Sequence, residues 1–299
     1  MLKVLKFGGS SLADARQFAK VKSIVEADPA RRVVIVSAPG KRFSGDHKIT
    51  DLLYLCAAHI KYGVSCEDIF AMIRDRYNEI IAECSLHISL DKEFDALWDK
   101  MKNGISQDEL ASRGEYFSAR LMAEYLGYEF VDAARWIKFK FDGTVDQDAS
   151  YAALRSLAED RKVVIPGFYG VMPDGHIRTF SRGGSDITGA LAAAALGADV
   201  EKHIFAVTDP VKGFLHAYAA EKKTRCLDFP ADTGGRYSVL SACGLAAAGA
   251  LGIDAERLLD GAAAMKKTLL ADTAGGAATA IAREVLRGEA AGRSVTVFW

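Results

Sequence analysis

Several classes of protein are excluded by what this 299-residue sequence lacks. Neither charge is in excess, because 38 basic side chains face 39 acidic ones and the formal net charge is −1. A general electrostatic attraction for nucleic acid or for an anionic membrane is therefore missing. No uninterrupted apolar run reaches the roughly 18 residues of a membrane span. We expect neither nucleic acid nor membrane as a partner.

Cysteine is also scarce and irregularly spaced. The five cysteines form no CxxC pair and have no histidine at metal-ligand spacing, so we expect no metal site built by the protein. The first residues, MLKVLKFGG, contain too few apolar side chains for a signal peptide. These absences together predict a cytoplasmic protein.

What the sequence does contain is typical of a folded α/β protein. Half of its residues are hydrophobic and 26% are charged, which excludes disorder, collagen and coiled coil. Short β-branched runs alternate with segments of helical period, which predicts a parallel sheet covered by helices. The predicted strands are Lys3–Phe7, Arg32–Ser37, Tyr128–Val131 and Lys162–Pro166. The predicted helices are Ala13–Ala27, Asp51–Lys61 and Gln107–Leu126.

The pattern changes in the second half of the chain. A turn signal at Met172–Gly175 predicts a β-hairpin between Phe168 and Phe180. Beyond residue 200 we predict strands at His203–Val207 and Thr224–Phe229, and helices at Pro210–Lys222, Leu240–Leu251, Ala255–Met265 and Ala277–Arg287. The chain ends in an apolar run, Ser294–Trp299, and a homodimer that covers this run is left open.

A first glycine pair lies between the first predicted strand and the first predicted helix. In the run Lys6–Ser11, the backbone N–H groups of Gly8, Gly9 and Ser10 can face the oxygens of a phosphate, and the lysine adds a positive charge. The alternative is a plain turn between a strand and a helix.

A second glycine pair leads into an alanine-rich predicted helix. Gly183 and Gly184 lie at the N-terminus of this helix, where its dipole favours an anion, and Arg182 is suited to hold a carboxylate. Asp186 follows, and its alternative role is that of an ordinary first-turn helix carboxylate.

Blocks of sequence over residues 1 to about 200 together resemble the aspartate kinase family. In chain order they are Lys6–Ser11, Val34–Ser37 with Lys48–Asp51, Ser112–Glu115 with Ser118–Leu121, and Phe180–Asp186. The resemblance implies the amino-acid-kinase fold, a three-layer αβα sandwich. It also implies transfer of the γ-phosphoryl group of MgATP to the β-carboxylate of L-aspartate, giving the 4-phospho-L-aspartate used in lysine, threonine and methionine synthesis.

The same resemblance implies roles for individual residues. Lys6 neutralises charge on the transferring phosphoryl group and Asp186 orients that lysine. Arg182 holds the α-carboxylate of aspartate and Glu115 holds its ammonium group; without the resemblance, Glu115 is a solvated glutamate on a helix. The other substrate-lining positions are Ser37, Thr50, Phe168 and Ser185. The nucleotide positions are Gly8, Gly9, Ser10, Gly183, Gly184, Thr208 and Asp209, with Mg²⁺ held mainly by the phosphates of ATP.

Residues from about 203 onward resemble a different family. Val207–Pro210, Asp232–Leu240 and Gly252–Asp254 are similar to an internal stretch of glucose-6-phosphate isomerase. This resemblance implies that Arg236 stabilises an enediolate. The motifs that carry the isomerase family's glutamate base, histidine and C-terminal lysine are not found in the sequence.

We therefore expect two parts, an amino-acid-kinase-like domain over 1–200 and an isomerase-like α/β segment over 201–299. The main functional expectation is an aspartate kinase that binds ATP and L-aspartate and is weakened by replacement of its nucleotide-binding part. One alternative is a catalytically inactive chimera, and a second is a glucose-6-phosphate isomerase fragment.

Overall fold

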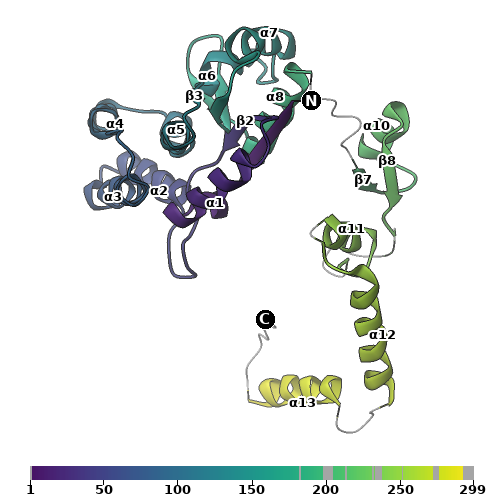
Figure 1. Ribbon diagram of the computed structural model, residues 1–299. Coiled ribbons are helices and arrows are strands. Elements are labelled where there is room, and N and C mark those ends of the chain that lie inside the picture. Colours follow the sequence, from purple (N-terminus) through teal and green to yellow (C-terminus); the bar gives the residue numbers. More distant parts are fainter. Residues whose placement is uncertain are drawn as a thin grey trace. The chain divides into compact units, whose positions relative to one another are not determined.

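The computed structural model describes residues 2–181, 183–197, 205–212, 214–230, 232, 238–250, 252–271 and 276–291. The chain divides into two units, Met1–Val200 and Glu201–Trp299, each with its own helices and strands (Figure 1). Within the described part, every helix is too short or too polar to cross a lipid bilayer.

A parallel sheet forms the centre of the first unit. Its four strands lie in the order β1-β2-β4-β3, with bounds β1 Lys3–Phe7, β2 Arg31–Val36, β4 Val163–Pro166 and β3 Glu129–Phe130. A separate antiparallel hairpin is formed by β5 (Tyr169–Val171) and β6 (Ile177–Thr179). All strand pairs in the main sheet are parallel, so their carboxyl ends meet at one edge.

The helices of the first unit cover both faces of this sheet (Figure 1). Side chains alternate along β2, so that Val34 and Val36 enter one hydrophobic core while Val33 and Ile35 enter the other. The first core contains side chains from η1 (Gly9–Leu12), α1 (Ala15–Glu26), α2 (Ile49–Lys61), α3 (Glu67–Glu83), α4 (Asp91–Asn103) and α5 (Gln107–Leu126). The second contains side chains from α6 (Ala133–Trp136), α7 (Gln147–Ala158) and α8 (Gly184–Ala195). The predicted three-layer αβα arrangement is confirmed.

Helix α5 is the central helix of the first layer and carries one of the sequence blocks noted above. It begins after Ser106, whose hydroxyl accepts the N–H of Glu109 at 3.1 Å, and ends at Gly127 in the left-handed conformation. Its buried positions include Ser112, Glu115 and Ser118, three polar residues that a purely structural helix would place in water.

The second unit contains a small β-α-β motif followed by helices. Strands β7 (Phe205–Thr208) and β8 (Arg225–Asp228) pair in parallel and are joined through α10 (Phe214–Lys222). Helices α11 (Ala242–Ala250), α12 (Ala255–Ala271) and α13 (Ala277–Ala290) follow. The prediction of a helix from Pro210 is wrong for its first turn, because Asp209 instead closes a turn by accepting the N–H groups of Val211 and Lys212. The apolar run 294–299 lies outside the described residues.

Candidate active site

The loops that follow β1 and β2 meet at the carboxyl edge of the sheet and border a pocket of about 450 Å³. This edge is where α/β sheets usually bind ligands. Five of the residues selected from the sequence line the pocket, namely Gly9, Ser10, Ser37, Thr50 and Glu115.

The two loops touch through their backbones. The N–H of Gly40 donates to the carbonyl of Gly9 at 2.8 Å. A Cβ atom at Gly40 would lie 2.7 Å from the carbonyl carbon of Gly9, and one at Gly9 would lie 2.9 Å from the carbonyl oxygen of Ala38. Only glycine fits at these positions, so the glycine loop and the loop after β2 form one continuous wall.

Glu115 is buried at the wall of this pocket. It is 4% exposed, and burial raises its pKa to about 8, although the N–H of Ala38 donates to the carboxylate and opposes the shift. Its Oε2 atom is buried without a hydrogen-bond partner. The alternative of a solvated glutamate is therefore wrong.

The residue before Glu115 explains how the carboxyl group comes so close to the loop. A Cβ atom at Gly114 would lie 2.7 Å from the Cβ of Ala38 and 3.2 Å from a methyl carbon of Leu53. Glycine at this position of α5 allows the helix to approach the loop, which brings the neighbouring glutamate to the pocket.

The two glycine motifs are joined by an ion pair. Lys6 Nζ, at the end of β1, lies 2.9 Å from Asp186 Oδ1, with side-chain exposures of 28% and 69%. Asp186 lies in the first turn of α8, where an ordinary helix carboxylate would also lie, and it contacts Lys6 as well. Gly183 precedes this turn with a φ of 60° and Gly184 is its first residue. The N-terminus of α8 and the lysine thus lie near one another.

Two further residues selected from the sequence, Ser185 and Phe168, lie at the same edge. Ser37 Oγ donates to Ser185 Oγ at 2.9 Å, which links the loop after β2 to α8. The N–H of Phe168 donates to Thr188 Oγ1 of α8 at 3.2 Å. Phe168 has a φ of 85°, which is uncommon for a residue with a side chain and is typical of functional sites.

Four other selected residues lie outside the described residues or in the second unit. Arg182 and Arg236 lie outside the described residues. Thr208 and Asp209 belong to the second unit. Hydrogen bonds from the N–H groups of Val211 and Lys212 lower the pKa of Asp209 and occupy its Oδ1 atom.

The structure also adds residues that sequence reasoning did not select. Ala38, Pro39, Gly40, Lys41 and Lys48 line the pocket beside Glu115. Lys48 is the first residue of a block that carries the family resemblance, so the sequence could have indicated it as a pocket residue. Lys41 lies outside these blocks, and no sequence pattern indicated it. Among the described residues, no group of three or more His, Cys, Asp or Glu side chains is arranged to hold a metal ion.

Two family models match the chain. Residues 1–209 match the amino acid kinase family, and residues 185–279 match phosphoglucose isomerase. The two matches overlap from the first turn of α8 to the end of β7.

Individual relatives show the same division. Aspartokinase 3 of Bacillus subtilis (strain 168) is 38% identical over 214 residues, which are 67% of this chain and 47% of that protein. The crystal structure of Clostridium acetobutylicum aspartate kinase is similar with a TM-score of 0.64 and 45% identity, over 71% of this chain and 48% of that one. Glucose-6-phosphate isomerase of Mycoplasmoides gallisepticum is 40% identical over 77 residues, 26% of this chain and 18% of that protein. The chain spans about half the length of these two kinases.

Proposed function

This chain belongs to the amino acid kinase family, and on that premise we propose that it is an aspartate kinase. It transfers the γ-phosphoryl group of MgATP to the β-carboxylate of L-aspartate, and the product is 4-phospho-L-aspartate. The observation that carries the proposal is Glu115, a buried carboxyl group with an unpartnered oxygen at a pocket beside the glycine loop. The names of the relatives at 38% and 45% identity support the choice of aspartate.

The acceptor site in this proposal is the pocket itself. Glu115 receives the ammonium group of aspartate, which supplies the missing hydrogen bond. Lys41 and Lys48 line the same pocket and favour a substrate with two carboxylates. Ser37 and Thr50 also line the pocket, and Ser185 contacts Ser37. Phe168 and Ser185 are assigned to the same substrate, and Arg182 is assigned to its α-carboxylate.

The phosphates are assigned to the two glycine motifs. Gly8, Gly9 and Ser10 supply backbone N–H groups, and Gly183 and Gly184 supply those at the N-terminus of α8. Lys6 neutralises charge on the transferring phosphoryl group, and Asp186 holds the lysine side chain in place. Mg²⁺ arrives on the nucleotide and shields the charge of its phosphates. No strong base is required, because the attacking carboxylate is ionised at neutral pH.

The nucleotide half of the site is where the alternative functions arise. Thr208 and Asp209, assigned to the nucleotide, lie in the second unit, within the overlap of the two family matches. A chain that cannot hold ATP would be a catalytically inactive chimera. The isomerase alternative rests on Arg236 and on the match of residues 185–279 to phosphoglucose isomerase. We expect no conversion of glucose 6-phosphate above background.

Trapping the acyl phosphate with hydroxylamine tests the proposal. Lys6→Ala should lower the rate of hydroxamate formation by about 10³-fold, because a fixed positive charge at the transferring group is lost. Lys3→Ala is the matched control on the same strand, since Lys3 pairs with Asp28 at 2.7 Å at the opposite end of β1. An unchanged rate in Lys6→Ala would overturn the proposed role.

A further inference from the structure

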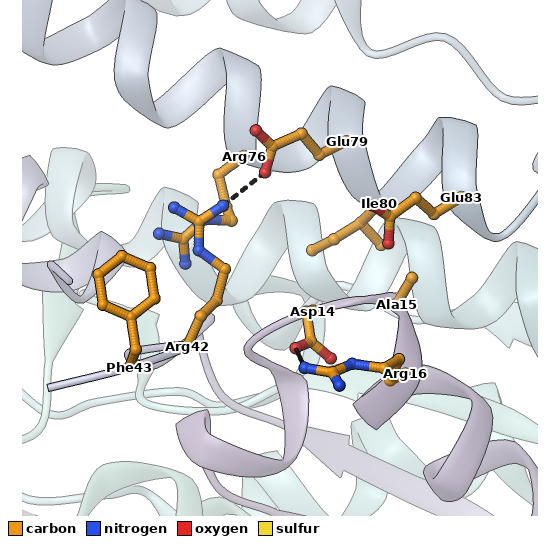
Figure 2. A pocket seen from close by; sticks show the side chains of 9 residues that line it. All are labelled: Asp14, Ala15, Arg16, Arg42, Phe43, Arg76, Glu79, Ile80 and Glu83. Carbon is orange, nitrogen blue, oxygen red and sulfur yellow. Dashed lines mark hydrogen bonds and ion pairs between the residues drawn. The ribbon is translucent and has the colours of Figure 1, made fainter.

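A second pocket, of about 620 Å³, borders the same loop between β2 and α2 (Figure 2). Arg42 and Phe43 from the loop and Arg76 and Glu79 from α3 line it. Figure 2 shows the two arginine side chains close together, with Arg42 reaching the carboxylate of Glu79. The cations at this pocket already have protein partners, so the pocket is poorly suited to recognise an anion.

Arg76 is the most buried charge in this group, with 5% of its side chain exposed. Its Nη2 atom donates to both carboxylate oxygens of Asp46, at 2.8 and 2.7 Å, and its Nη1 atom donates to the carbonyl of Gly40 at 3.2 Å. One planar guanidinium therefore holds the loop after β2 at two points.

Asp46 is the second component, with 7% of its side chain exposed. Burial opposes its ionisation, but hydrogen bonds from the side chain and backbone N–H of Arg42 and from a neighbouring backbone group hold its pKa well below the usual range. Arg42 in turn donates to Glu79 Oε2 at 2.7 Å. The carboxylate stays charged, and both ends of the loop are tied to α3.

The same loop reaches the candidate active site. Gly40, whose carbonyl accepts from Arg76, uses its N–H to hold the carbonyl of Gly9 at 2.8 Å. Pro39, next to it, accepts the N–H of Ile49 at the start of α2 at 3.0 Å. A continuous series of hydrogen bonds thus runs from α3 to the glycine loop.

We propose that Arg76, through Asp46 and the carbonyl of Gly40, is a positioning residue that fixes both loops bordering the candidate active site. Its effect on catalysis rests on the proposed function, whereas its effect on the loops does not. Stability alone does not require such a pair, because well-packed apolar residues often replace a buried ion pair without loss of stability. The forked geometry gives the loop one fixed position.

Hydrogen–deuterium exchange of the full chain tests the positioning directly. The double variant Arg76→Met/Asp46→Leu removes the ion pair but fills its volume. Amides in residues 8–12 and 37–48 should exchange at least tenfold faster in this variant, while those in β4 stay unchanged. Unchanged exchange in both loops would overturn the inference.

A conservative variant and a matched control sharpen the test. Arg76→Lys keeps the charge beside Asp46 but lacks the fork, so residues 8–12 should still lose protection. Arg74→Met is the control on the same helix, because Arg74 pairs at 3.0 Å with Asp91 and Asp95 of α4 and not with the loop, within the described part of the chain. It should leave both loops protected.

Steady-state kinetics tests whether the position of these loops affects catalysis. In the double variant the KM for aspartate should rise about tenfold or more with a smaller change in kcat, because the misplaced wall belongs to the acceptor pocket. Faster loop exchange with no change in KM would contradict the link to catalysis. A wild-type chain that forms no hydroxamate would refute the proposed function and leave the exchange test of the loops intact.

Discussion

Among the residues proposed to bind substrate, Glu115 lies in an environment that differs strongly from water. An ordinary glutamate is ionised at neutral pH, but burial raises the pKa of this one to about 8. A bound ammonium group would reverse the shift, because it pairs with the unpartnered oxygen and favours the charged form. The proposed binding of the substrate ammonium group should therefore lower the pKa of Glu115.

Glu115 should make the stability of the chain depend on pH. Between about pH 4.5 and pH 8 the unfolded chain has released this proton and the folded chain retains it, so the free energy of unfolding falls as pH rises through this window. The loss approaches about 5 kcal/mol once the folded group is ionised above pH 8. Glu115→Gln removes the titration, and its stability relative to wild type should increase from pH 5 to pH 8.5.

Urea unfolding of both proteins at several pH values measures this difference, and the comparison cancels groups that titrate identically in the two chains. Glu124→Gln, at an exposed position of the same helix, is a control that should follow wild type. A constant difference between Glu115→Gln and wild type across the pH range would show that Glu115 is not protonated in the folded chain.

At the scale of elements, the periodicity of the sequence predicted the centre of the first unit well. The predicted strands over β1, β2 and β4, the helix over α5 and the hairpin at Met172–Gly175 are confirmed within one or two residues. These segments are buried or tightly turned, so their patterns are strong. The prediction that a helix begins at Pro210 was wrong, because the side chain of Asp209 competes with helical hydrogen bonding.

Helices α3 and α4 were not assigned from the sequence. The signal in α3 was present, since Phe70, Ile73, Tyr77 and Ile80 are buried at spacings of three and four residues. No sequence pattern indicated that Arg76 contacts the loop after β2. Its partner Asp46 is 30 residues away, and an arginine in a helix is ordinarily expected in water.

The approach of α5 to the loop after β2 predicts an unusual effect of alanine. Alanine normally stabilises a helix relative to glycine by about 1 kcal/mol. At Gly114 the added Cβ would lie 2.7 Å from Ala38, so Gly114→Ala should destabilise the chain by about 1–2 kcal/mol and weaken aspartate binding.

Gly189 in α8 is the matched control for this substitution. Its added Cβ would meet only ordinary contacts, 3.7 Å from Lys6 Cβ and 3.9 Å from Ile35. Gly189→Ala should raise the free energy of unfolding by about 0.5–1 kcal/mol, measured in the same urea titration. Equal effects at the two positions would contradict the close approach of α5.

At the scale of the whole molecule, the two units differ in how completely their apolar residues are covered. The first unit buries two extensive cores. In the described part of the second unit, the buried hydrophobic side chains are alanines, while Leu270, Met265 and Leu286 are more than half exposed. Such exposed apolar side chains are expected of a segment that matches less than a fifth of an isomerase, because the rest of that protein is not matched.

Nucleotide binding separates an active kinase from an inactive chimera. If the chain completes its ATP site, MgATP at about 100 times its Kd should stabilise the folded state by roughly 2.7 kcal/mol and raise the melting temperature. Thermal unfolding with and without MgATP measures this, and magnesium sulfate at the same concentration is a control for Mg²⁺ and for a simple anion. No shift with MgATP would favour the inactive chimera.

The most direct test is the formation of aspartyl hydroxamate by the intact chain. With MgATP, L-aspartate and hydroxylamine, we expect hydroxamate to accumulate at a rate proportional to protein concentration, and to stay at the blank level when either MgATP or aspartate is omitted. Hydroxamate at the blank level with all components present would contradict the proposal that this chain is an aspartate kinase.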